Sequence, residues 1–474
     1  MSCQQRPGRI NCGVGDLISK RFLLPLVVVL AGAAAFAASG PNSPVPTTVT
    51  ASIAQSGQVA GDSHESTADA NDRLNDRTTA LSKKDRVAVF EEVWKRISER
   101  YYDPSFNGVD WNSVRDRYRP RLDQVGEDNE FYALLNRMVG ELHDAHTRLH
   151  TPRERIDRER FLAVTPGLSI WEVENKPVVI SVDPSSEAAR AGIVPGMIVT
   201  SVNGIPVANR LEQVKLAIGG SSTERAERLR LYRRLLDGDP GAKITLGLTD
   251  NTGKPLTAAV SLKSVSDAPD VSWRQLPFGY GYIRLTLWKS PIHDRFRAAL
   301  DQFKTAPGVV IDLRDNPGGE VSEVLKIAGF FFSNHEPFGN FITRAGKHLE
   351  LATAGGQNAA YTGRVAILIN ESSGSGSEMF AEVMQESGRA VVVGRQSCGC
   401  LLGISEFKKL KGGGELAVSE LGYVSPHGHR VEGIGVIPDD TVGITLSDLQ
   451  SKRDSILLEA ETALRSSKAA AAVH

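Results

Sequence analysis

One stretch of this sequence joins an expected strand to an expected helix: Val365-Ala366-Ile367-Leu368-Ile369-Asn370-Glu371-Ser372-Ser373-Gly374-Ser375-Gly376-Ser377-Glu378-Met379-Phe380. Its first six residues form a mostly apolar run of strand length, and residues 378–386 have helical spacing. Gly374 and Gly376 give Ser375 small neighbours on a permissive backbone. At a helix N-terminus, backbone N–H groups are unpaired. This position suits Ser375 to attack a carbonyl carbon and hold the resulting oxyanion, the alternative being a flexible Gly/Ser loop.

The composition is that of a globular protein with two or three domains: 474 residues, 41% hydrophobic, with a net charge of −1. The balanced charge gives no indication of nucleic-acid binding, so we expect no nucleic-acid partner. Basic residues precede an apolar run from Phe22 to Ala38, in which 35–37 is a small-x-small cleavage site. The run is at the short limit for spanning a bilayer. We therefore expect a signal peptide or an uncleaved anchor, and an exported protein of the periplasm or envelope.

The remaining chain changes character several times, which predicts a multidomain α+β protein. The expected parts are a signal peptide or anchor (1–37), a disordered linker (38–84), a helical N-terminal segment (85–155), a β-rich module (156–265), an α/β layered core (266–446) and a C-terminal helix and tail (447–474).

His146 continues the apolar face of an expected helix. Met138 and Leu142 are four residues apart, and one further step reaches His146. A helix that extends this far would point His146 toward the core. The alternative is a satisfied core or capping histidine. His143 and His150 lie off this face, and we expect them to be exposed.

A second turn is expected to meet the one that contains Ser375. Residues 308–313 form a buried strand, and the turn 315–319 follows it. In open α/β sheets, loops at the C-terminal ends of strands gather on one side. Gly318 and Gly319 are suited to present backbone N–H groups there.

Neither a metal nor a cofactor is expected. His427-Gly428-His429 has no further ligand pattern beside it. Cys398 and Cys400 are the two cysteines that follow the leader. A bond across one intervening residue is geometrically feasible but strained, so we expect free or labile thiols.

The β-rich module resembles a PDZ domain over residues 185–204. The resemblance implies that the loop containing Gly167, Leu168 and Ser169 receives a chain-terminal carboxylate on its N–H groups, while the peptide adds to a sheet edge. The alternative is a module that only packs against its neighbour. Strands are expected at 178–182, 198–202 and 243–248 of this module and at 281–285 of the core, and residues 221–236 read as an inserted helix.

From Val87 to Val442 the chain resembles the tail-specific, or carboxyl-terminal-processing, serine peptidases. The resemblance is carried by four segments: 312–319 (DLRDNPGG), 373–378 (SGSGSE), 388–390 (GRA) and 433–439 (GIGVIPD). It implies a ClpP/crotonase-like core with Ser375 as the nucleophile. Many members use a lysine 25 residues after the serine, with a glutamine four residues further on. Here Cys400 and Ile404 stand at those positions, so a Ser/Lys dyad is unavailable.

A second branch, similar to the tricorn core protease, uses serine, histidine and glutamate. Its pattern matches Glu141-Leu142-His143-Asp144-Ala145-His146 and the segment around Glu432. The resemblance implies His146 as the general base and Glu432 as the group that orients its ring. The N–H groups of Gly376 and of Gly318 or Gly319 would form the oxyanion hole.

These observations predict an exported serine endopeptidase that cleaves unfolded or C-terminal polypeptide segments. The alternatives are a non-catalytic peptide-binding protein of the same fold and an envelope scaffold. The sequence leaves the oligomeric state open.

Overall fold

The computed structural model describes residues 80–354 and 360–466. The expected signal peptide or anchor and most of the expected linker lie outside these residues. Among the described helices, none has the length and apolarity needed to cross a membrane.

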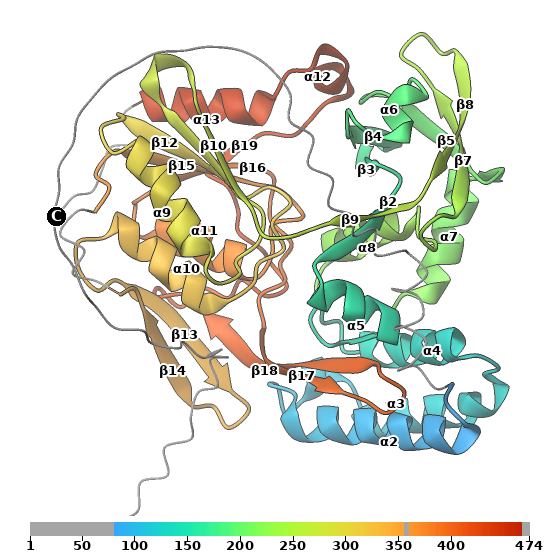
Figure 1. Cartoon of the computed structure of the whole chain (residues 1–474). Coiled ribbons are helices and arrows are strands. Elements are labelled where there is room, and N and C mark those ends of the chain that lie inside the picture. The colour runs from blue at the N-terminus through green and yellow to red at the C-terminus, as the bar shows by residue number, and fades with distance from the viewer. Residues whose placement is uncertain (1–79, 355–359, 467–474) are drawn as a thin grey trace, which may run out of the picture. The chain divides into compact units, whose positions relative to one another are not determined.

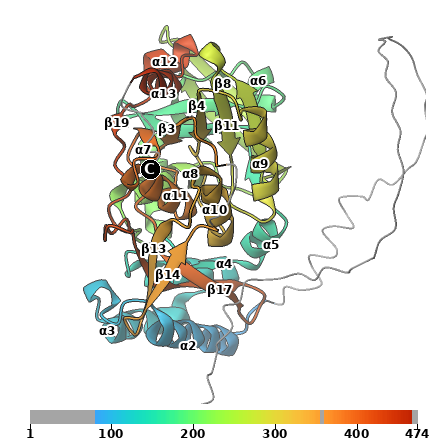
Figure 2. The ribbon, with the colours of Figure 1, turned by 90° about the vertical axis from the view of Figure 1, so that its left-hand side faces the viewer.

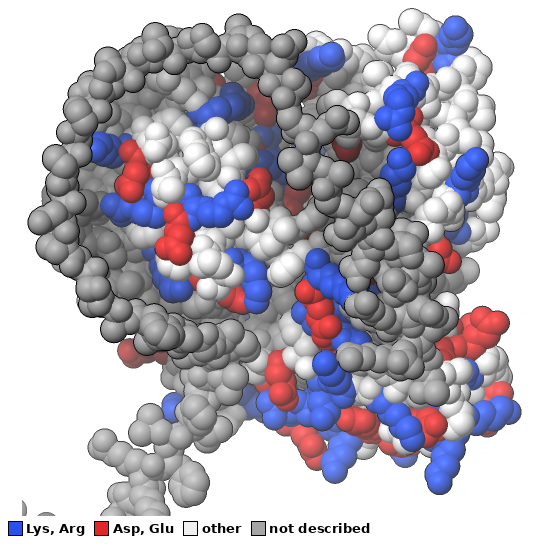
Figure 3. Space-filling view, in the orientation of Figure 1, with Lys and Arg blue, Asp and Glu red and all other residues white. Residues whose placement is uncertain are grey.

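The first part of the described chain is helical. Its α-helices are α2 (Lys83–Arg100), α3 (Trp111–Tyr118), α4 (Asp128–Gly140) and α5 (Pro152–Glu159). The helical periodicity has a direct cause, since Phe90, Val93 and Ile97 of α2 are fully buried in one cluster with Phe131 and Leu135 of α4. On the face shown in Figure 3, acidic and basic side chains are interspersed over this region.

A five-stranded sheet connects this helical part to the core. Its strands are β1 (Arg148–His150), β13 (Pro337–Thr343), β14 (His348–Ala352), β17 (Gly403–Lys409) and β18 (Glu415–Val424). β1 pairs antiparallel with β18, with Arg148 opposite Ala417. Figures 1 and 2 both place β17 and β18 beside α2. The pairing of β1 with β18 brings the residues just before β1 to the core.

The module that follows is built on a second sheet, ordered β3-β4-β5-β7-β8. Its elements are β2 (Leu162–Thr165), β3 (Leu168–Val173), β4 (Lys176–Val182), α6 (Glu187–Arg190), β5 (Ile198–Val202), β6 (Ile205–Pro206), α7 (Val207–Ala217), α8 (Glu224–Arg234), β7 (Lys243–Thr249), β8 (Pro255–Ser261) and β9 (Lys263–Ser266). The strands expected at 178–182, 198–202 and 243–248, and the inserted helix within 221–236, are confirmed.

A six-stranded sheet forms the centre of the last part. Its order is β10 (Val271–Gln275), β11 (Gly281–Leu285), β12 (Gly308–Asp312), β15 (Arg364–Ile369), β16 (Val391–Gly394) and β19 (Asp440–Thr441). The strands from β11 to β19 are parallel to one another, and β10 is antiparallel.

Helices cover both faces of this sheet (Figure 1). They are α9 (Ile292–Gln302), α10 (Val321–Ala328) and α11 (Gly376–Glu386) on one face and α13 (Ser455–Arg465) on the other; α12 (Leu446–Ser451) precedes α13. Ile311 and Ile367 point to the first face, whereas Val310 and Ala366 point to α13. This alternation explains the continuous apolar runs in the sequence, since both faces of each strand are buried.

The turns after β12 and β15 meet, as the sequence predicted. The Gly374 N–H donates to the carbonyl oxygen of Asn316 at 3.1 Å, and Ser377 Oγ donates to the same oxygen at 3.1 Å. The register explains why, because Asp312 lies opposite Leu368 and both strands end at the same edge.

Candidate active site

Ser375 lies at the N-cap of α11 with φ 50° and ψ −114°. A residue other than glycine rarely adopts this backbone conformation, and its cost has to be met by the surrounding contacts. The Ser375 N–H supplies two of them, donating to the carbonyl oxygen of Cys400 at 2.9 Å and to Glu378 Oε2 at 2.9 Å. The side chain is partly exposed. The serine is thus held at the end of its helix, with its side chain within reach of solvent.

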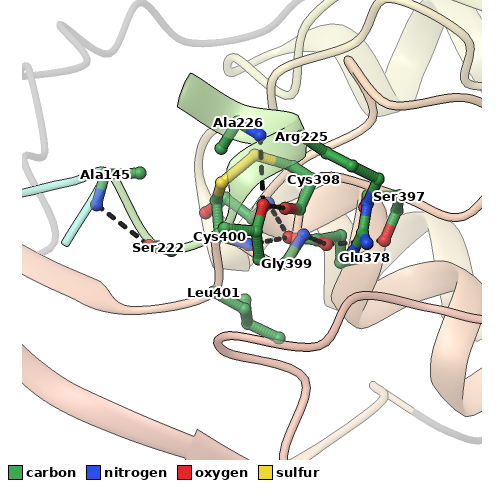
Figure 4. The surroundings of a disulfide bond; sticks show 12 residues. Ala145, Ser222, Arg225, Ala226, Glu378, Ser397, Cys398, Gly399, Cys400 and Leu401 are labelled. Carbon is green, nitrogen blue, oxygen red and sulfur yellow. Dashed lines mark hydrogen bonds between the residues drawn. A yellow bond between two sulfur atoms is a disulfide. The ribbon is translucent and has the colours of Figure 1, made fainter. Parts of the chain in front are cut away.

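Glu378 is a buried carboxylate that joins the serine turn to the segment 397–401. It accepts hydrogen bonds from Ser397 Oγ (2.6 Å), Gly399 N–H (2.6 Å) and Cys400 N–H (3.0 Å), which Figure 4 shows converging on it. Burial raises the pKa of Glu378 to about 7, and these hydrogen bonds oppose the shift. Sequence reasoning did not single out this residue. The Ser375-x-x-Glu378 spacing, which is that of a capping box, was the available signal.

Cys398 and Cys400 form a disulfide bond, so the prediction of free thiols is wrong. The bond is accommodated because Gly399 between them has φ +73° and the two Cα atoms are 5.2 Å apart, within the ordinary range for disulfides. Both cysteines are buried, 8% and 4% exposed, and pack with Ala226 of α8 and with Ala145.

His146 lies in a loop and not on a helix. α4 ends at Gly140, so the expected helical extension through Leu142 is wrong. Asp144 positions the loop instead, because its buried carboxylate accepts the N–H of His146 at 2.7 Å and the N–H of Thr147 at 3.2 Å. Thr147 Oγ1 in turn accepts the N–H of Ser419 on β18 at 3.0 Å.

The neighbouring histidines differ from each other. His143 is exposed, as expected. His150 is mostly shielded from solvent, and its Nδ1 is 2.8 Å from the buried Glu415 Oε1, so its expected exposure is wrong. Its position on β1, paired with β18, explains the burial.

The imidazole of His146 is held in a neutral form. Burial lowers its pKa to about 4; Arg148 acts in the same direction and Asp144 opposes it. Nδ1 is buried without a hydrogen-bond partner. Within the described residues no hydrogen bond joins the imidazole to Ser375. At neutral pH the ring is therefore unprotonated and can accept a proton, and its Nδ1 makes no hydrogen bond.

Glu432 is buried and binds the same 397–401 segment, since its Oε2 accepts the Leu401 N–H at 2.6 Å. Burial, together with the charge of Asp144, raises the pKa of Glu432 to about 8. Asp144 and Glu432 thus influence each other electrostatically.

The glycines expected in the oxyanion hole differ in whether their N–H groups already donate a hydrogen bond. The Gly318 N–H donates to Asn316 Oδ1 at 2.9 Å. The N–H groups of Gly319 and Gly376 have no hydrogen bond within the described residues. A Cβ atom at Gly376 would lie 3.5 Å from the Gly319 nitrogen, so the two N–H groups are neighbours beside Ser375. They are the donors available to an oxyanion.

The expected peptide-binding loop leads into β3, an edge strand of its sheet. Gly167 has φ +80°, and a Cβ there would come 2.3 Å from the Ser186 Cβ. Leu168 is buried and Ser169 exposed. α8 lies beside this strand, with the ring of Tyr232 5.4 Å from that of Trp171.

The N-terminal end of α8 contacts the disulfide segment. Thr223 Oγ1 donates to the carbonyl oxygen of Cys398 at 2.7 Å, and Arg225 Nε donates to that of Ser397 at 3.1 Å. A small, partly open pocket adjoins the N-terminal end of α8. It is lined by residues of β3, of α8, of the serine turn and of the segment after β16: Trp171, Glu172, Glu224, Arg225, Arg228, Glu371 and Arg395.

Side chains with metal-ligand chemistry lie at the other end of α11. Glu382, Glu386 and His429 each offer one atom, and these atoms lie within 4.8 Å of one another. Glu382 is seven residues after Ser375 along the helix, roughly 10 Å at 1.5 Å per residue, so the group is separate from the serine turn.

Known proteins resemble this chain in both sequence and fold. Residues 279–442 match Peptidase family S41, and residues 82–140 match the Tricorn protease C1 domain. The chloroplastic carboxyl-terminal-processing peptidase 3 of Arabidopsis thaliana is 27% identical over 373 residues, 73% of this chain and 67% of the relative. The carboxyl-terminal-processing protease of a Picosynechococcus strain is 28% identical over 381 residues, which cover 77% of this chain and 84% of the relative.

Two solved structures share the fold. The photosystem II D1 C-terminal processing protease has a TM-score of 0.53 at 22% identity, covering 81% of this chain and 98% of that one. Mature CPAF has a TM-score of 0.60 at 15% identity, and the match covers 81% of this chain and 96% of that one. Residues 279–442 therefore carry a domain of peptidase family S41, a family of serine peptidases, and residues 82–140 are related to the tricorn protease C1 domain.

Proposed function

We propose that this protein is an exported serine endopeptidase that cleaves unfolded or C-terminal segments of polypeptides, with Ser375 as nucleophile and His146 as general base. One observation carries the proposal: three separate parts of the candidate site contact the segment 397–401. The Ser375 N–H binds the Cys400 carbonyl, Ala145 beside His146 packs against the disulfide, and Glu432 binds the Leu401 N–H.

The chemistry follows from the state of each group. Ser375 Oγ attacks the scissile carbonyl carbon while neutral His146 takes its proton. The N–H groups of Gly319 and Gly376 stabilise the oxyanion, each contributing about 3 kcal/mol. His146 then gives the proton to the leaving amine, and water releases the acyl group from Ser375 by the same sequence. Glu432, in its ionised form, orients the imidazole through Nδ1.

Substrate capture is assigned to the module that contains β3. A peptide in extended form adds to the free edge of β3, and its terminal carboxylate meets the loop of Gly167, Leu168 and Ser169, as in a PDZ domain. The pocket beside α8 supports this assignment, because its lining includes residues both of β3 and of the turn that contains Ser375. Export to the periplasm or envelope is proposed from the N-terminal sequence alone.

A non-catalytic peptide-binding protein of the same fold is the second candidate. Two observations favour it: Cys400 occupies the position of the lysine found in many members, and in the described residues Ser375 makes no hydrogen bond to His146.

Labelling with a fluorophosphonate probe separates the two candidates. We expect labelling of the wild-type protein, complete loss in Ser375→Ala, and loss of at least a hundredfold in rate for His146→Ala. His143→Ala is the matched control, because this exposed histidine lies three residues from His146 and should leave labelling unchanged. A wild-type protein that neither reacts nor cleaves an unfolded casein substrate would establish the binding protein. Full labelling of His146→Ala would show that His146 is not the general base for Ser375.

A further inference from the structure

The C-terminal half of α11 presents two carboxylates to the loop that follows β18. Glu382 and Glu386 are one helical turn apart and so lie on the same face. Their side chains are 11% and 7% exposed. His429 Nδ1 is 3.2 Å from Glu382 Oε1 and 2.8 Å from Glu386 Oε1, and His427 Nδ1 is 4.0 Å from Glu386 Oε2.

The charge of this group is not balanced by protein cations. Within the described residues, neither glutamate forms an ion pair with a lysine or arginine, and both are paired with histidines alone. Two carboxylates that are shielded from solvent and have no lysine or arginine partner are unfavourable unless a cation balances their charge.

An unused ligand atom points to what would balance the charge. Glu386 Oε1 accepts from Ser425 Oγ at 2.5 Å, whereas Glu386 Oε2 is buried and has no hydrogen-bond partner. A buried carboxylate oxygen that makes no hydrogen bond needs a partner. His427 Nδ1 lies 4.0 Å from this oxygen, and the His427 side chain is 63% exposed.

We propose that Glu382, Glu386 and His429 bind a divalent transition-metal ion, Zn²⁺ in the first instance, with His427 as the fourth ligand. Imidazole nitrogen and carboxylate oxygen are a preferred ligand set for Zn²⁺, and four ligands suit its tetrahedral geometry. The sequence did not reveal this site because the glutamates precede the His427-Gly428-His429 segment by some forty residues and reach it through the fold.

The ion would join two parts of the candidate catalytic site. α11 begins directly after Ser375, and His429 is three residues before Glu432. The loop is already tied to the helix, since Ser425 Oγ donates to Glu386 and accepts the His429 N–H at 2.9 Å. A bound ion would fix this loop, and thereby the approach to Glu432. This positioning role rests on the proposed function, whereas ion binding itself does not.

The test is a Zn²⁺ titration of the untagged, chelator-treated full chain in competition with a chromophoric chelator, with bound metal counted by mass spectrometry. The Ser375→Ala protein is used throughout, so the outcome is independent of peptidase activity. We expect one high-affinity ion per chain and a higher unfolding temperature when Zn²⁺ is present. His427→Ala/His429→Ala and Glu386→Gln should each weaken binding at least tenfold.

His348→Ala is the matched control, since His348 is exposed on β14, outside the group, and its loss should change nothing. The two exposed histidines keep the test decisive if Glu386→Gln folds poorly. Equal Zn²⁺ affinity in the control and in the double histidine variant overturns the proposal, and so does the absence of stoichiometric binding to the parent protein.

Discussion

The buried carboxylate of Glu378 accepts the backbone N–H of Ser375 at 2.9 Å. The same side chain also binds Ser397 Oγ and the N–H groups of Gly399 and Cys400. One acidic group therefore connects the strained serine turn to the segment 397–401. Ser375 can be held at φ 50° because this group and the Cys400 carbonyl share its N–H.

Glu378→Gln should therefore damage both stability and reactivity. Glutamine keeps the size of the side chain, but its NH₂ group would face protein donors in place of a carboxylate oxygen. Leaving buried donors unpaired costs about 1–3 kcal/mol each, so we expect the free energy of unfolding to fall by about 2–4 kcal/mol. Labelling of Ser375 should slow at least tenfold. Urea denaturation and labelling kinetics measure the two effects.

Glu350→Gln provides the comparison for this experiment, because Glu350 is exposed on β14 and a change there should stay within about 0.5 kcal/mol. If Glu378→Gln unfolds at the wild-type urea concentration and labels at the wild-type rate, Glu378 does not hold the turn.

Many helices and strands of this fold could be predicted from the sequence, because their hydrophobic patterns are local. The strands 198–202 and 281–285 were predicted with the bounds that the structure has, since buried strands leave short apolar runs. The meeting of the turns after β12 and β15 was also predicted, because parallel neighbouring strands end at one edge.

The features that the sequence did not predict depend either on pairing with a distant strand or on specific local contacts that leave no periodic pattern. β1 is only three residues long and is stabilised by its pairing with β18, so no local sequence pattern predicted it. His146 was expected to face the core if the helix extended that far, but α4 ends at Gly140, and the competing contact of Asp144 with the His146 N–H has no periodic signature. The disulfide depends on the left-handed conformation of Gly399.

Gly318→Ala should slow labelling of Ser375 at least a hundredfold, because it displaces the serine and a neighbouring oxyanion donor. Gly318 has φ +105°, and an added Cβ would lie 2.6 Å from the Ser375 Cβ and 2.8 Å from the Gly376 nitrogen. Something must move, and the serine and its neighbouring oxyanion donor are in contact with the new atom. A displacement of about 1 Å costs roughly a hundredfold in rate, so we expect at least that loss in fluorophosphonate labelling.

Gly329→Ala is the matched change for this prediction. Its Cβ would find no atom closer than 3.7 Å, so folding and labelling should match the wild type. Normal labelling of folded Gly318→Ala would show that the turn can accommodate the extra methyl group without loss of Ser375 reactivity, which would contradict the prediction.

Reduction of the Cys398–Cys400 bond should destabilise the protein modestly and slow labelling. A closed loop of three residues restricts the unfolded chain only slightly, which corresponds to about 1–2 kcal/mol. The carbonyl of Cys400 holds the Ser375 N–H, so release of the bond loosens the serine turn. A thiol-free phosphine reductant should lower the unfolding midpoint of the wild type to that of Cys398→Ser/Cys400→Ser. The double variant itself must not respond to the reductant; an equal response would assign the effect to something other than this bond.

Glu432 should give the peptidase a rise in activity through mildly alkaline pH. Burial and the charge of Asp144 raise its pKa from 4.5 to about 8, whereas burial lowers that of His146 to about 4. Above pH 5 the imidazole is already neutral, so its own titration lies outside the working range. The ionised Glu432 that orients the ring forms only as the pH passes about 8, and kcat/KM should increase there. Glu432→Gln should lower kcat/KM and remove that increase.

Stability should change in the opposite direction. A carboxyl group whose pKa is higher in the folded than in the unfolded state stabilises the fold below pH 4.5, and this contribution is lost as the pH rises through 8. Wild-type protein should therefore lose stability relative to Glu432→Gln between pH 5 and 8, as followed by thermal unfolding of both proteins across that range. Parallel stability curves, together with an alkaline rise in kcat/KM that persists in Glu432→Gln, would show that another group titrates and that Glu432 has no part in orienting His146.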